Sequence, residues 1–164
     1  MRLRRVAPLT LSRRLWLAGA AAIGLGLSLS ARSRQPRAGE AAEPIAQPPD
    51  AAPRTLMDRA LEMRRRAQDA GDQSFGAVIA REGRIVGQAA SAVVTRNDPT
   101  AHAEMEAIRD AAQRLGRRDL TGCTLYSSSR PCPMCEAAAY WAGIERLIHG
   151  AELTDLGAPR LTRC

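Results

Sequence analysis

The sequence predicts an α/β fold with three layers, in which helices cover both faces of a mixed, mostly parallel sheet. Stretches with helical spacing of apolar residues alternate with strand-like runs, in the order α-β-β-α-β-α-β. Strands joined through helices favour parallel pairing, and the first two strands form an antiparallel hairpin. At 164 residues the chain has room for one domain. The expected elements are a helix over 55–71, strands over 74–81 and 84–94, a helix over 101–115, a strand over 123–129, a helix from 131–133 to about 142, and a strand over 146–149.

Local sequence signals support each element in turn. The first helix has an apolar face, made of Leu56, Ala60, Leu61, Met63 and Ala67. Glu82 and Gly83 form a hairpin signal between the first two strands, and Phe75, at the start of the first strand, is expected in the core. Thr100 is a good N-cap for the second helix, whose apolar positions are Ala103, Ala107, Ile108, Ala111, Ala112 and Leu115. Pro131 and Pro133 are typical of a helix start.

Two short motifs carry the side chains with the strongest chemical signal. His102, Cys132 and Cys135 are three ligands of the kind that zinc prefers, and each lies where a helix is expected to begin. Three protein ligands leave a fourth tetrahedral position for water, as in catalytic rather than structural sites. The positive ends of both helix dipoles would favour thiolate over thiol. We therefore predict one zinc ion per chain.

Glu104 is the expected general base beside this metal. Two thiolates and a neutral imidazole cancel the charge of Zn²⁺, so water is acidified less than with three histidines and a separate proton carrier is useful. Taken alone, the two cysteines would fit a redox pair or chance thiols equally well, and Glu104 would fit a solvated helix carboxylate. Their combined order and spacing favours a catalytic zinc site.

The sequence resembles the cytidine-deaminase-like zinc deaminase superfamily, in particular its guanine deaminases and tRNA adenosine deaminases. The resemblance rests on residues 97–109 (NDPTAHAEMEAIR) and 131–135 (PCPMC), with weaker support at 75–79 and 140–142, and it extends from 55 to about 150. It implies a cytidine-deaminase-like sandwich in which His102, Cys132 and Cys135 hold zinc and Glu104 shuttles protons.

The resemblance also implies residues that contact the substrate, namely Ser91, Ala103 and Trp141. The segment around Trp141 is more similar to guanine deaminases than to the tRNA enzymes. This chain departs from the family pattern at Ser91, where relatives carry asparagine, and at Arg130, where they usually carry glutamate. It is also short at its C-terminus, and Arg163 falls roughly where guanine deaminases have an acidic substrate ligand.

The distribution of charge argues against nucleic acid as a partner. The formal net charge is +7, but residues 1–30 hold five arginines and no acidic residue, which leaves 19 arginines against 17 acidic residues, or +2, for the rest. A nearly neutral domain gains little from counterion release on a polyanion. The arginines at 64–66 are therefore expected on a solvated helix face, because no aromatic residues interleave with them.

The N-terminus has the layout of an export signal. Two adjacent arginines precede an apolar run over 15–29, and small residues follow it, which resembles a twin-arginine signal and favours a bacterial source. The run is shorter than a spanning helix needs, and an uncleaved anchor or a fortuitous amphipathic start are the alternatives. We predict a signal segment over 1–31, a disordered linker over 32–54, and a deaminase domain over 55–164 without a stable membrane span.

The sequence thus predicts an exported, zinc-dependent hydrolytic deaminase that releases ammonia from a guanine-like purine base or nucleoside. It would be periplasmic or extracellular, or cytoplasmic if the signal does not function. The alternatives are a tRNA adenosine deaminase and an inactive zinc-binding module. Relatives commonly dimerise, so a homodimer is possible. Cys123 is expected to be buried, its pairing with Cys164 stays open, and His149 is expected in the core or at the rim of the site.

Overall fold

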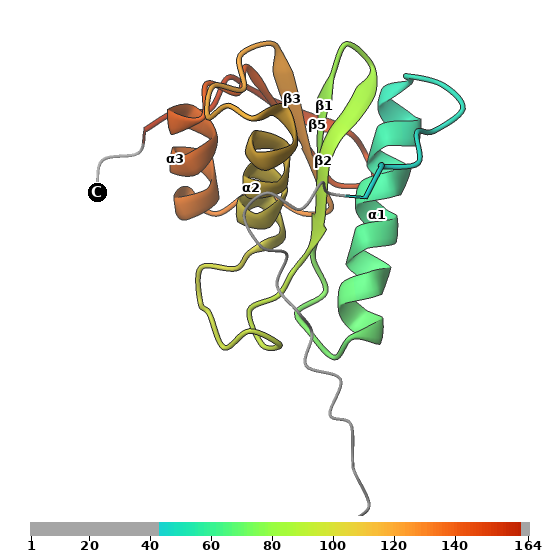
Figure 1. Cartoon of the computed structure of the whole chain (residues 1–164), viewed down its shortest axis with the longest axis vertical. Helices are drawn as coiled ribbons and strands as arrows, with labels where there is room; N and C mark the ends of the chain where they lie inside the picture. The colour runs from blue at the N-terminus through green and yellow to red at the C-terminus, as the bar shows by residue number, and fades with distance from the viewer. Residues whose placement is uncertain (1–42, 162–164) are drawn as a thin grey trace, which may run out of the picture. The chain divides into compact units, whose positions relative to one another are not determined.

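The structure is a computed structural model, and it describes residues 43–161 of the chain. This part folds into three helices and a five-stranded sheet, which confirms the predicted α/β class (Figure 1). The elements are α1 (Pro53–Asp69), β1 (Gly76–Arg81), β2 (Arg84–Ala90), α2 (Ala103–Leu115), β3 (Cys123–Ser127), α3 (Pro133–Trp141), β4 (Arg146–His149) and β5 (Thr154–Gly157). Within residues 43–161, none of the helices combines the length and the apolar character required to cross a bilayer.

The sheet is mixed, but it is not mostly parallel as predicted. Its strand order is β2-β1-β3-β4-β5, and β3 with β4 is the parallel pair, whereas β1 pairs antiparallel with both β2 and β3, and β4 with β5. The connection through α2 does join strands of the same direction, β2 and β3. These two strands are not neighbours, however, because β1 lies between them.

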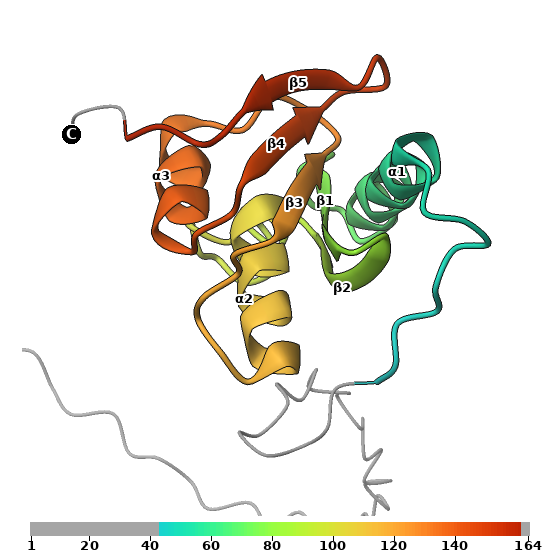
Figure 2. The ribbon, with the colours of Figure 1, turned by 90° about the horizontal axis from the view of Figure 1, so that it is seen from above.

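Helices cover both faces of the sheet, which confirms the three predicted layers. Figure 2 shows α1 on one face and α2 with α3 on the other. The alternation of side chains along β1 explains this arrangement: Ala77 and Ile79 are buried in the core cluster that contains α2 and α3 residues, whereas Val78 and Ala80 are buried in the cluster that contains α1 residues. Strand β1 therefore contributes to two separate cores.

Two glycines allow the helices to approach the sheet closely. A Cβ atom placed on Gly76 would lie 2.2 Å from the backbone nitrogen of Arg64 in α1. A Cβ atom on Gly87 would lie 2.6 Å from the Cβ atom of Ala111 in α2. Since any larger residue would push the helix away, these glycines set the distance at which α1 and α2 pack on the sheet.

The residues before α1 belong to the folded domain, so the predicted linker is wrong for 43–54. Helix α1 begins at Pro53, two residues before the predicted domain start. Ile45 packs against the core on the α1 side. The Gln47 side chain accepts a hydrogen bond from the backbone N–H of Ile85 (2.8 Å) and donates one to its carbonyl (3.0 Å). The predicted signal over 1–31 and the linker over 32–42 lie outside the described residues.

Four further local predictions differ from the structure. Strand β2 ends at Ala90, because the chain turns immediately afterwards, and β5 was not expected because its four residues lack apolar alternation. Phe75 is 40% exposed rather than in the core. Thr100 is not the N-cap of α2: its backbone N–H and hydroxyl both donate to Asp98 (2.8 and 2.7 Å), and the N-cap is His102.

Candidate active site

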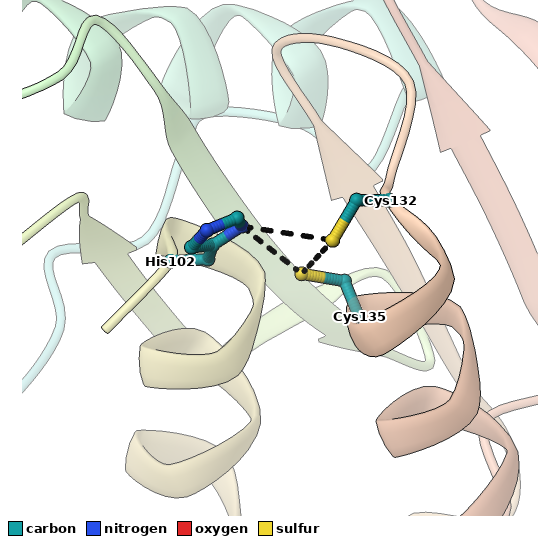
Figure 3. A group of neighbouring side chains, drawn as sticks. All are labelled: His102, Cys132 and Cys135. Carbon is teal, nitrogen blue, oxygen red and sulfur yellow. Dashed lines mark hydrogen bonds between the residues drawn. The ribbon is translucent and has the colours of Figure 1, made fainter. Parts of the chain in front are cut away.

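The three predicted metal ligands meet where two helices begin. His102 is the N-cap residue of α2, Cys132 is the N-cap residue of α3, and Cys135 lies in the first turn of α3. Figure 3 shows the imidazole of His102 and the two sulfur atoms pointing toward one another from these helix ends. The proline at 133 suits the first helical turn, since it has no N–H to leave unpaired. The sequence thus brings the three side chains together as predicted.

The distances between the ligand atoms fit tetrahedral zinc. His102 Nδ1 lies 3.7 Å from Cys132 Sγ and 3.6 Å from Cys135 Sγ, and the two sulfurs are 3.6 Å apart. Zinc bonds of about 2.3 Å to sulfur and about 2.0 Å to nitrogen, at tetrahedral angles, require about 3.8 Å between the two sulfurs and about 3.5 Å between sulfur and nitrogen. One ion can therefore contact all three atoms, and His102 would bind it through Nδ1.

The electrostatics of the site depend on the ion. Burial raises the pKa of the Cys135 thiol, and the neighbouring Glu104 carboxylate and Cys132 raise it further. Without a cation this thiol would keep its proton, so binding of a metal would displace it. The N-termini of α2 and α3 both direct their positive dipole ends at the ligands and favour the charged thiolates.

Glu104 lies beside the ligands and is almost fully buried. It occupies the first turn of α2 and is 4% exposed. The hydroxyl of Ser127, at the end of β3, donates a hydrogen bond to Glu104 Oε1 (2.9 Å). Its other oxygen, Oε2, lies 3.6 Å from Cys135 Sγ. The carboxylate is therefore held in one orientation next to the metal position, which excludes the alternative of a solvated helix side chain.

The three predicted substrate residues occupy different surroundings. Ala103 is fully buried at the first position of α2, between a ligand and Glu104. Ser91 is buried, and its hydroxyl donates to Asp72 Oδ1 (2.9 Å). Trp141 ends α3 and is 76% exposed, in edge-to-face contact with Tyr140. Six residues of helix, or about 9 Å, separate it from Cys135, so the structure does not bring Trp141 to the ligands.

The other singled-out side chains lie outside the ligand group. His149 pairs with Ser127 across β3 and β4, and burial lowers its pKa, with Arg130 acting in the same direction. Arg130 is exposed just before the second ligand motif. Cys123 is buried as expected. Its possible partner Cys164, and Arg163, lie outside the described residues.

Sequence reasoning missed two residues: Ser127, which contacts Glu104, and Asp72, which contacts the chain between β2 and α2. The alternation along β3 could have identified Ser127, since it shares a strand face with Leu125, which packs in the core beneath α2. No local signal identifies Asp72. It lies just beyond the C-terminus of α1 and contacts residues about twenty positions later in the chain.

Comparisons with known proteins agree with this site. A guanine deaminase from Bacillus subtilis (strain 168) is 45% identical over 102 residues, which are 62% of this chain and 65% of that protein. A tRNA-specific adenosine deaminase from Aquifex aeolicus (strain VF5) is 44% identical over 92 residues, 56% of this chain and 61% of that protein. A solved structure of guanine deaminase from Bacillus subtilis matches with a TM-score of 0.59 at 42% identity, over 60% of this chain and 64% of that one.

The chain thus spans less than two thirds of the length of each of these relatives. The matched family is described as the cytidine and deoxycytidylate deaminase zinc-binding region, and the match covers residues 51–151, which include all three ligands and Glu104. This chain belongs to that zinc-binding deaminase family.

Proposed function

We propose that the protein is a zinc-dependent hydrolytic deaminase that acts on a guanine-like purine base or nucleoside and releases ammonia. The observation that supports this most is the position of Glu104. A buried carboxylate, fixed by Ser127, lies 3.6 Å from the sulfur of Cys135, which is one of three side chains spaced for tetrahedral zinc. A structural zinc site needs a fourth protein ligand and has no use for such a carboxylate.

The residues divide the chemistry between them. Bound zinc would act as a Lewis acid that makes water a better nucleophile near neutral pH. Glu104 would take a proton from the attacking water through Oε2 and deliver it to the amino nitrogen that leaves as ammonia. Ser127 keeps Oε1 occupied, so that Oε2 stays directed at the ligands. Overall, a ring C–NH₂ group and water give a ring carbonyl and NH₃.

Two observations favour a small purine over tRNA. The guanine deaminase is 45% identical to this chain over 102 residues, whereas a tRNA-specific adenosine deaminase that matches over a comparable 103 residues is 40% identical. The domain beyond residue 30 also carries little net positive charge, and the three arginines at 64–66 lie exposed on α1, on the sheet face opposite the ligands. The tRNA enzymes in the same comparison keep RNA editing as the alternative to test.

The decisive experiment measures zinc content and ammonia release on the same purified full-length protein. The panel should contain guanine, guanosine, adenine, adenosine, cytosine and cytidine, with an RNA anticodon stem-loop assayed in parallel for inosine. We expect stoichiometric zinc and ammonia from a free purine or its nucleoside. Inosine in the stem-loop without ammonia from small purines would replace this proposal with tRNA editing. Stoichiometric zinc without any turnover would indicate an inactive zinc-binding module.

A further inference from the structure

The carboxylate of Asp72 gathers hydrogen bonds from two separate segments. Its Oδ1 accepts from the backbone N–H of Gln73 (2.8 Å) and from the hydroxyl of Ser91 (2.9 Å). Its Oδ2 accepts from the backbone N–H groups of Val94 (3.0 Å) and Thr95 (2.8 Å). Three of the four donors thus belong to the chain that follows β2. Asp72 ties the end of α1 to that chain.

The segment held by Asp72 leads directly to a metal ligand. We call residues 91–102, between β2 and α2, the 91–102 loop. Near its start, the backbone N–H of Ala92 donates to the carbonyl of Ala101 (3.0 Å), next to His102. The N–H of Ala101 in turn donates to the carbonyl of Asp98 (3.1 Å). Fixing the first residues of the loop therefore also fixes the residue that precedes the ligand.

The charge on Asp72 makes these contacts strong. Partial burial opposes ionisation, but the N–H groups of Thr95 and Gln73 and the hydroxyl of Ser91 outweigh it and hold the pKa of this carboxyl well below its usual range. A carboxylate that accepts several N–H bonds stays ionised at every pH at which the protein would work. Hydrogen bonds to a charged group are also stronger than those between neutral groups. The 91–102 loop is thus held by the charged side chain of Asp72 and not only by hydrogen bonds within its own turns.

We propose that Asp72 is a positioning residue for the metal site, which acts through the 91–102 loop to hold His102 where one ion can also reach Cys132 and Cys135. This inference rests on the zinc site of the proposed function. Ser91 would then help to position the 91–102 loop, in addition to the predicted substrate contact, because its hydroxyl donates a hydrogen bond to Asp72. The competing interpretation is that Asp72 merely stabilises the fold, like any other carboxylate in a turn.

The test compares the zinc affinity of matched full-length variants by competition with a chromogenic chelator. Asp72→Asn keeps the size of the side chain, but its single amide oxygen can replace only one of the two carboxylate oxygens. The donors at the other oxygen therefore lose their charged acceptor. The control is Asp119→Asn. Asp119 also caps a turn, accepting from the N–H (2.9 Å) and hydroxyl (2.6 Å) of Thr121, but it precedes β3 at the strand end opposite the ligands. Thermal unfolding of the zinc-free proteins is measured alongside.

We expect Asp72→Asn to bind zinc about tenfold more weakly, as for residues that orient metal ligands, and Asp119→Asn to stay within about twofold of wild type. Ser91→Ala, which removes one of the three loop contacts, should give an intermediate affinity. If Asp72→Asn fails to fold, the zinc affinity of Ser91→Ala serves as the test instead. Equal zinc affinity in wild type, Asp72→Asn and Ser91→Ala, or an equal loss of affinity in Asp119→Asn, would overturn the inference. Absence of zinc from the wild-type protein would instead refute the proposed function.

Discussion

Replacement of Glu104 by glutamine tests the proposed chemistry with the smallest change in structure. The substitution exchanges one carboxylate oxygen for an NH₂ group. The remaining carbonyl oxygen can still accept from Ser127, and the new N–H group can donate toward Cys135 Sγ, which lies 3.6 Å from the present Oε2. Because the side chain keeps its volume and both its contacts, we expect the variant to fold and to bind zinc like the wild type.

The magnitude follows from the loss of the proton carrier. An amide cannot take a proton from water near neutral pH, and among the described residues the metal-ligand group itself, His102, Cys132 and Cys135, contains no carboxylate that could replace Glu104. A positioned general base contributes about 10²–10⁴-fold to a rate, which corresponds to about 3–5 kcal/mol of barrier. We therefore expect kcat to fall at least about 100-fold, with KM little changed.

The assay pairs ammonia release with metal analysis of the same sample. Glu136→Gln is the matched control, since Glu136 follows Cys135 directly but its carboxylate accepts from the backbone N–H of Arg160 (3.1 Å) instead of approaching the ligands. This control should retain wild-type kcat. If Glu104→Gln contained full zinc and kept more than about a tenth of wild-type kcat, Glu104 would not be the general base.

Three further predictions concern the metal, the packing and the N-terminus. Cys132→Ala should lose zinc in metal analysis, whereas Cys123→Ala, at a buried cysteine outside the ligand group, should retain it; zinc retained at full stoichiometry in both would contradict the ligand assignment. Gly87→Ala should lower the free energy of unfolding in urea by about 1–3 kcal/mol, because its Cβ would lie 2.6 Å from that of Ala111; an unchanged midpoint would mean that the helix shifts freely. Mass spectrometry of exported protein should find an N-terminus near residue 31, and a full-length cytosolic product would refute the export signal.

The metal site was predictable because its information is local. His102 and Glu104 are two residues apart at a helix start, and Cys132 and Cys135 are three apart at another. Such spacings fix the relative positions of the side chains within one helical turn, whatever the rest of the chain does. Only the approach of the two helix N-termini depends on the tertiary fold. That approach was expected because the four residues form a catalytic zinc site only if they lie together.

The parts that could not be predicted depend on pairing across long distances. Ser127 reaches Glu104 only because β3 lies under α2, which the order of strands decides. The sheet was expected to be mostly parallel because helical connections usually join neighbouring parallel strands, whereas here β1 separates β2 from β3. Asp72 accepts hydrogen bonds from residues about twenty positions later in the chain, and neither composition nor periodicity carries a signal for such a contact.

The side chain of Gln47 has a consequence for how the domain should be delimited. Strand β2 is the outermost strand on its side of the sheet, and an outermost strand offers unpaired backbone groups to any other extended chain. Gln47 occupies both polar groups of Ile85 and so imitates one residue of a neighbouring strand. A protein that begins at residue 55 would lack Gln47, and the backbone groups of Ile85 on the edge strand β2 would be unpaired. We expect such a protein to self-associate through β2, although every metal ligand would remain in place.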